Sequence, residues 1–104
     1  MDEKAFAVYM EQWRGEIGQK IYLQKDAQLD EGHTAEFEPL LRSMRTPVQI
    51  LWGERDAWLD PAIAKRLRDL LPNAALELIP DAGHFSMEDD PQKIANALAD
   101  FFAP

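Results

Sequence analysis

The sequence contains no cysteine, and this absence excludes disulfides, thiolate nucleophiles and zinc–thiolate sites. Its two histidines, His33 and His84, are too few for a multi-histidine metal site. No apolar run approaches the roughly 20 residues that a membrane-spanning helix needs, and the acidic N-terminus lacks the apolar segment of a signal peptide. We therefore expect a soluble, cytoplasmic chain without a metal or other cofactor.

Basic residues are also scarce. Eleven lysines and arginines stand against 19 acidic residues, and the formal net charge is -8. A negative field of this kind repels phosphate backbones and anionic lipid surfaces, so we expect neither nucleic acid nor membrane as a partner. The length of 104 residues allows one domain, and the hydrophobic content of 46% is ordinary for a globular protein.

The first half of the chain is predicted to be helical. Apolar residues recur every three or four positions over residues 3–27, which places them on one helix face. Gly15 and Gly18 weaken this stretch by up to about 1 kcal/mol each. The pattern leaves open one long helix that bends or two helices that meet near Gly15, and we favour the single helix. A polar loop over residues 28–36 and a short helix over residues 38–45 should follow.

The second half alternates strand and helix patterns. Residues 48–52 form a short apolar run typical of a strand buried on both faces, and residues 76–79 form a second one. Asp-Pro pairs at Asp60-Pro61 and Asp90-Pro91 are N-cap and first-turn signals. The second of these opens a helix over 92–102, whose apolar face we expect to be buried. The order predicts an α/β fold with two parallel strands and flanking helices.

Each predicted strand leads to a titratable residue. Asp56 follows the first strand and His84 follows the second. In a parallel sheet, functional groups gather in the loops at the carboxyl ends of the strands, so these two loops should lie side by side. A carboxylate there can orient an imidazole and stabilise its protonated form, which is the acid–base half of a nucleophilic triad.

Two blocks of residues around this pair carry a family resemblance. Residues 46–56, TPVQILWGERD, resemble the segment that bears the triad acid in α/β-hydrolases. Ala82-Gly83-His84-Phe85, with Glu88 and Pro91 after it, resembles the loop that bears their catalytic histidine. The resemblance implies that Asp56 and His84 are catalytic. It further implies that residues 46–104 form the C-terminal strand–helix–strand–helix part of such a domain, and that residues 1–45 return from a cap to the core.

The nucleophile of that family has no counterpart here. It belongs on a G-x-S-x-G turn earlier in the chain, but Ser43 lacks flanking glycines and Ser86 lies two residues after His84. We therefore expect the C-terminal portion of a hydrolase that cleaves an ester or related bond of a small molecule and is inactive alone. An aspartate nucleophile, as in epoxide hydrolases and haloalkane dehalogenases, stays open. So does a non-enzymatic module that self-associates or complements another fragment.

Side chains beside the two loops have structural interpretations. We expect Trp52 to pack in the core and Trp58 on the surface, although Trp58 also has the position to line a substrate pocket. The sequence leaves open whether Glu88 forms a hydrogen bond with the histidine loop. The 48–52 strand should have a free edge, which predicts a homodimer or a higher even oligomer. Antiparallel pairing of this strand and a swap of the N-terminal helix are both open.

Overall fold

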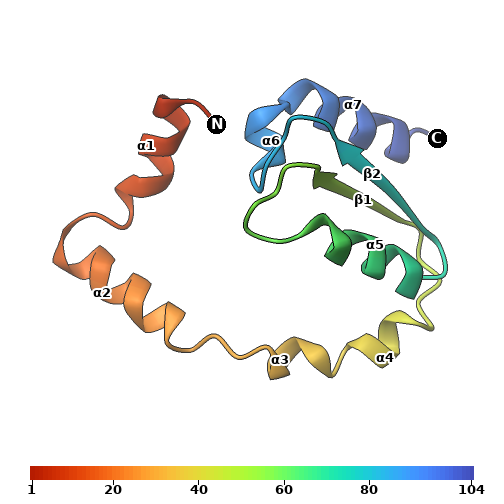
Figure 1. Cartoon of the computed structure of the whole chain (residues 1–104), viewed down its shortest axis with the longest axis horizontal. Helices are drawn as coiled ribbons and strands as arrows, with labels where there is room; N and C mark the ends of the chain where they lie inside the picture. Colours follow the sequence, from red (N-terminus) through yellow and green to blue (C-terminus); the bar gives the residue numbers. More distant parts are fainter. The chain divides into compact units, whose positions relative to one another are not determined.

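The computed structural model describes residues 1–104, which divide into two compact units, Met1–Phe37 and Glu38–Pro104. Figure 1 shows the first unit as helices only and the second as two strands with helices around them. No helix in the chain combines the length and the apolar character needed to cross a bilayer. The candidate site belongs entirely to the second unit, so each unit is described separately below.

The first unit contains helices α1 (Glu3–Glu11), α2 (Gly15–Asp26) and α3 (Gly32–Ala35). Asp2 caps α1 by accepting a hydrogen bond from the Ala5 N–H at 2.7 Å. The preferred single helix over 3–27 is wrong: α1 ends at Glu11 and α2 begins at Gly15, whose φ of 77° is a left-handed conformation that a continuous helix does not contain. The loop predicted over 28–36 is also interrupted, because α3 forms one short turn within it.

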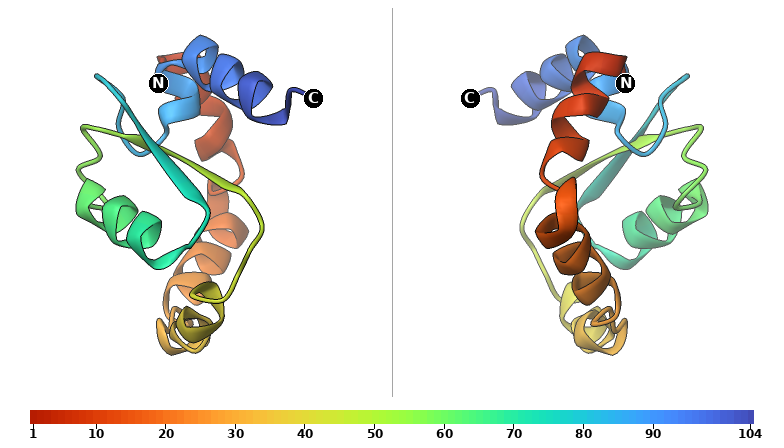
Figure 2. Two further views of the ribbon diagram at one scale, coloured as in Figure 1. Left: turned by 90° about the vertical axis from the view of Figure 1, so that its right-hand side faces the viewer. Right: turned by 90° about the vertical axis from the view of Figure 1, so that its left-hand side faces the viewer.

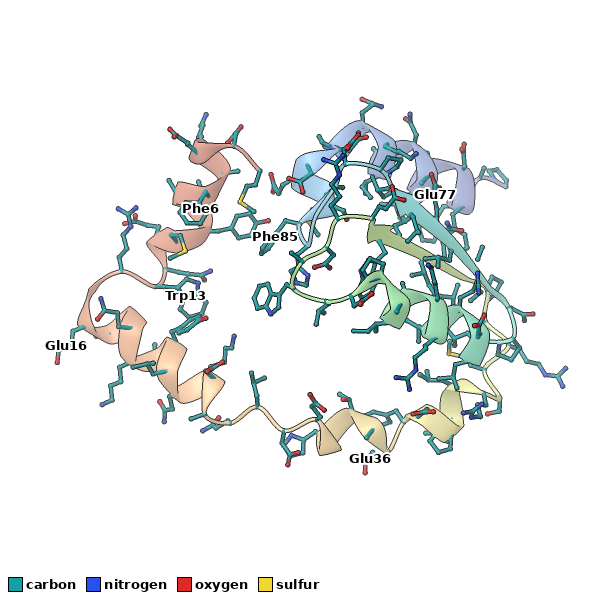
Figure 3. The ribbon with its side chains drawn as sticks, in the orientation of Figure 1. Phe6, Trp13, Glu16, Glu36, Glu77 and Phe85 are labelled. Carbon is teal, nitrogen blue, oxygen red and sulfur yellow. The ribbon has the colours of Figure 1, made fainter.

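The apolar face of these helices lies largely open within the unit. Trp13 makes an edge-to-face contact with the Tyr22 ring, with ring centroids 5.4 Å apart. Phe6 and Trp13 are labelled in Figure 3, which shows them on the first helix and just after it. The other apolar positions of the predicted face are exposed; they are Phe6, Met10, Ile17 and Ile21.

The second unit has the predicted α/β order. Strands β1 (Val48–Gly53) and β2 (Ala74–Ile79) pair in parallel, with Val48 opposite Ala74 and Gly53 opposite Ile79. The helices are α4 (Glu38–Leu41), α5 (Pro61–Leu70), α6 (Ser86–Asp89) and α7 (Pro91–Phe102). The predicted fold class is confirmed. The short helix predicted over 38–45 ends earlier, at Leu41, and α6 is a short helix that the sequence patterns did not predict.

Two aspartate caps fix where the long helices begin. The Asp60 carboxylate accepts a hydrogen bond from the Ala62 N–H at 2.8 Å, and that of Asp90 accepts one from the Lys93 N–H at 3.0 Å. Figures 1 and 2 show α5 and α7 on opposite sides of the strand pair. The core beneath α5 is centred on Ile50, Ala64 and Leu71.

Burial in this unit is more limited than the patterns suggest. Within β1 only Ile50 and Gly53 are buried, so the strand is not covered along both faces. No residue of α7 is buried, and Leu98 and Phe102 on its predicted inner face are exposed. The physical reason is that a two-stranded sheet offers little area for a twelve-residue helix to cover.

Candidate active site

The candidate site is built from the loops that follow β1 and β2. Their backbones are hydrogen bonded to each other: the Glu54 N–H donates to the Ile79 carbonyl at 3.0 Å, and the Arg55 N–H donates to the Ala82 carbonyl at 2.9 Å. An ion pair between the exposed side chains of Arg55 and Asp81 also joins the loops. The parallel register therefore continues beyond the strands and brings both loops to the same end of the sheet, at the carboxyl ends of its strands.

Gly53 permits the close approach of these loops. A Cβ atom at this position would lie 2.1 Å from the Gly83 carbonyl oxygen and 2.5 Å from that of Ala82. Both distances are far below van der Waals contact, and both atoms belong to the backbone. The absence of a side chain at Gly53 is thus a condition for the position of the histidine loop.

Asp56 is held by its own loop. One carboxylate oxygen, Oδ1, accepts hydrogen bonds from the N–H groups of Trp58 and Leu59, both at 2.9 Å. The Trp52 indole N–H donates to the Leu59 carbonyl at 3.3 Å and so ties this turn back to β1. The Asp56 side chain is only 3% exposed. Its second oxygen, Oδ2, remains available for a partner on the neighbouring loop.

That partner is His84. Its Nδ1 lies 2.9 Å from Asp56 Oδ2. Because an ionised carboxylate can only accept, Nδ1 carries the hydrogen, and in the neutral ring Nε2 has a free lone pair. The His84 side chain is 32% exposed, so a reactant can approach it. The structure thus brings together the two residues that the sequence singled out, while His33 lies in the first unit, 3.8 Å from Asp30.

The pKa of Asp56 is lowered although the group is buried. Burial alone raises the pKa, because it removes the charged form from water. Hydrogen bonds from the Leu59 N–H, from His84 and from the Trp58 N–H, with the charge on His84, outweigh burial and lower the pKa. Asp56 is therefore a stable anion facing an imidazole, which is the electrostatic arrangement that supports a general base.

The histidine loop has its own supports. The Gly83 N–H donates to Asp89 Oδ2 at 2.8 Å, which fastens the residue before His84 to α6. The His84 ring contacts two aromatic rings, Trp58 at a centroid distance of 4.6 Å and Phe85 at 5.4 Å. Phe85 is labelled in Figure 3, at the end of the loop that follows β2.

Some of these partners were not expected from sequence. Glu88 does hydrogen-bond the histidine loop, through its backbone N–H, which donates to the Phe85 carbonyl at 2.9 Å. The side-chain bond from Asp89 to the Gly83 N–H was not predicted. Trp58 was expected to pack on the surface, and the structure places its ring against His84. Its position two residues after Asp56 was the one available signal.

Neither serine is bonded to His84. The Ser43 hydroxyl donates to the Leu40 carbonyl at 2.9 Å, and Ser86 is buried at the start of α6. No cluster of three or more histidine, cysteine, aspartate or glutamate side chains has the arrangement of a metal site. The site as described is an acid–base pair that can accept a proton at His84 Nε2.

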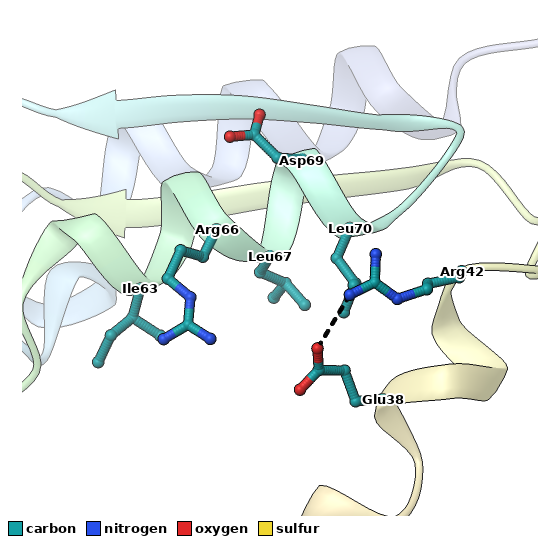
Figure 4. A pocket seen from close by; sticks show the side chains of 7 residues that line it. All are labelled: Glu38, Arg42, Ile63, Arg66, Leu67, Asp69 and Leu70. Carbon is teal, nitrogen blue, oxygen red and sulfur yellow. Dashed lines mark hydrogen bonds and ion pairs between the residues drawn. The ribbon is translucent and has the colours of Figure 1, made fainter.

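A separate pocket lies between α4 and α5, with a volume of about 410 Å³. Figure 4 shows its charged and apolar lining, including the Arg42–Glu38 ion pair at 3.2 Å. None of its lining residues belongs to the loops that carry Asp56 and His84. The pocket is therefore not part of the acid–base site.

Comparison with known sequences and structures agrees with this architecture. A family profile described as alpha/beta hydrolase fold matches residues 3–91. The uncharacterized hydrolase YugF of Bacillus subtilis is 38% identical over 61 residues, which cover 59% of this chain and 22% of that protein. The bovine (Bos taurus) monoacylglycerol lipase ABHD6 is 37% identical over 60 residues, covering 58% of this chain and 18% of the lipase.

Solved structures extend the similarity to most of the chain. An alpha/beta hydrolase fold protein from Burkholderia ambifaria superimposes with a TM-score of 0.88 at 29% identity, covering 96% of this chain and 37% of that one. A thermophilic esterase from Thermogutta terrifontis gives a TM-score of 0.59 at 26% identity, over 62% of this chain and 24% of the esterase. The chain spans about a fifth of the length of the curated relatives named above. With its family profile, its parallel strand pair and its structural neighbours in agreement, the chain belongs to the α/β-hydrolase fold family.

Proposed function

We propose that this chain supplies the acid and the general base of a hydrolytic triad, with Asp56 and His84 as its catalytic residues. The observation that carries the proposal is the 2.9 Å contact between His84 Nδ1 and Asp56 Oδ2, with Oδ1 of the same carboxylate held by two backbone N–H groups. Such a carboxylate fixes one imidazole tautomer and one ring orientation. The nucleophile comes from a segment outside these 104 residues.

In the reaction, His84 Nε2 takes the proton of the nucleophile's hydroxyl as its oxygen attacks the substrate carbonyl. Asp56 stabilises the resulting imidazolium, and that proton then passes to the leaving alkoxide. In the second half, Nε2 takes a proton from water, whose oxygen attacks the acyl intermediate, and the proton returns to the nucleophile. With an aspartate nucleophile, His84 instead activates only the water that attacks the covalent intermediate.

The substrate class proposed is a small-molecule ester or a related bond. Its support is that the relatives include monoacylglycerol lipases and an esterase. The chain alone should not turn such substrates over, since neither Ser43 nor Ser86 is bonded to His84. A purified chain that hydrolyses activated esters, and loses this activity in Ser43→Ala or Ser86→Ala, would contradict the proposal.

A chimera tests the proposal directly. In this chimera, residues 46–104 replace the corresponding segment of the Thermogutta terrifontis esterase, and the rest of the esterase would supply the nucleophile. Hydrolysis of an ester is then the readout. The folded chimera should hydrolyse esters, and His84→Ala or Asp56→Asn should abolish most of this activity. His33 lies outside the grafted segment and cannot serve as a control. The matched control is Glu54→Gln, an exposed carboxyl-to-amide change beside the same strand end. Full activity in the His84→Ala chimera would refute the assignment.

A second role, association through the sheet edge, also has a specific observation behind it. The sheet contains only two strands, so each has one open edge. In a parallel pair, alternate residues direct their backbone groups to the neighbour. The N–H groups of Val48 and Glu54 point toward β2, where they donate to the carbonyls of Asn73 and Ile79. The backbone groups of the alternate residues Gln49 and Leu51 therefore point to the open edge of β1. We propose that this edge pairs with another strand, a second copy in the case of the isolated chain.

A further inference from the structure

We infer that Trp58 is a positioning residue for His84: its indole ring holds the imidazole against Asp56. This inference rests on the proposed function, because it concerns the residue that would act as general base. The Trp58 ring lies 4.6 Å from the His84 ring between centroids, at an interplanar angle of 43°.

Trp58 acts on both members of the pair. Its backbone N–H donates to Asp56 Oδ1 at 2.9 Å. Its side chain contacts the His84 imidazole, which donates to Asp56 Oδ2. The main chain of one residue thus fixes the carboxylate, and its side chain limits rotation of the imidazole. A movement of Trp58 would disturb the acid and the base together.

The loop itself holds Trp58 in place. On its C-terminal side, the Leu59 N–H bonds Asp56 at 2.9 Å and the Leu59 carbonyl accepts from the Trp52 indole at 3.3 Å. Asp60 then caps α5. Trp58 is nevertheless 71% exposed, so burial of its own large apolar surface does not account for its position. The ring contact with His84 is what its side chain contributes.

Two physical effects follow from that contact. The indole excludes water from one side of the Nδ1–Oδ2 hydrogen bond, and a bond in a less polar environment is stronger and better directed. The π-face also attracts the imidazolium that forms when Nε2 takes a proton. Leucine at position 58 would retain apolar volume but would offer neither the planar surface nor the quadrupole.

The test measures the His84 tautomer by nitrogen NMR of the full chain with labelled histidine, under mildly alkaline conditions. His33, exposed in the first unit, is the internal reference in each spectrum. In the wild type, His84 should be predominantly Nδ1–H. Trp58→Leu should lower the ratio of Nδ1–H to Nε2–H about fivefold, the effect of losing an aromatic ring pair of this kind, and Trp58→Phe should restore most of it.

Two further variants make the result specific. Ile63→Ala truncates an exposed apolar side chain in the separate pocket between α4 and α5, so it should leave the ratio unchanged. Asp56→Asn should shift the ratio toward that of His33. If Asp56→Asn has this effect but Trp58→Leu does not, the inference about Trp58 is wrong and the acid–base pair stands. If wild-type His84 already resembles His33, the proposed function itself fails.

Discussion

Gly53→Ala is the most direct perturbation of the approach between the two loops. The added Cβ would lie 2.1 Å from the Gly83 carbonyl oxygen, whereas ordinary contact begins at about 3.5 Å. One of the two backbones must therefore move by more than about 1 Å. Gly53 does not have a positive φ, so the effect is purely steric.

The magnitude follows from what such a movement disrupts. Overpacking a buried position costs about 1–3 kcal/mol. The Arg55 N–H bond to the Ala82 carbonyl, 2.9 Å long, joins the same two loops, and losing it adds about 1 kcal/mol. We expect Gly53→Ala to lower the free energy of unfolding by about 2–4 kcal/mol. For a domain of this size, that lowers Tm by roughly 10–25 °C.

Thermal and urea unfolding of the full chain measure this loss, and His84 NMR reports whether the imidazole has left Asp56. The matched control is Gly83→Ala on the opposite loop. A Cβ there meets Asp89 Oδ2 at 3.5 Å, an ordinary contact, so its effect should be under about 1 kcal/mol. If the two variants unfold at the same temperature and both retain the His84 signature, the close approach of the loops does not constrain the site.

Three further predictions follow from the same contacts. Because the folded-state pKa of Asp56 is lowered, its carboxylate contributes stability that is present above the ordinary value of about 3.9 and is lost as pH falls through the folded-state value. Urea midpoints of the wild type should therefore fall more steeply below that pH than those of Asp56→Asn, and parallel curves would contradict this. Arg55→Ala removes an ion pair whose side chains are mostly exposed, so the urea midpoint should change by less than the equivalent of about 1 kcal/mol. Sedimentation equilibrium at micromolar concentration should show a dimer or higher even oligomer, because β1 has an open edge; a monodisperse species at 11.9 kDa would refute self-association.

Local signals predicted the second unit well. Asp60 and Asp90 cap helices because their side chains reach N–H groups two and three residues away, an interaction that a short window of sequence specifies. The same window cannot decide Gly15, because glycine weakens a helix and also permits the positive φ that ends one. The four-residue helices α3 and α6 were missed because one turn has too few positions for a periodic pattern.

Apolar spacing predicts which residues can share a face, but it does not identify what covers that face. Ile17 on α2 and Phe102 on α7 fit their helical patterns, and both are exposed. Burial depends on a neighbouring element, and the two strands of this sheet cover little area. The burial predicted for α7 was therefore wrong, although the helix itself forms where its pattern indicated.

The sequence predicted one part of the candidate site and not the other. Asp56 and His84 could be paired in advance because each follows a strand and parallel strands end at one edge. Trp58 and Gly53 could not, because their importance depends on distances across two loops, 4.6 Å between rings in one case and 2.1 Å to a carbonyl in the other. The contacts described for this pair all lie within residues 52–89. The orientation of His84 is therefore set by the strand ends and their loops, and under the proposed function a nucleophile would approach an Asp56–His84 pair that is already in place.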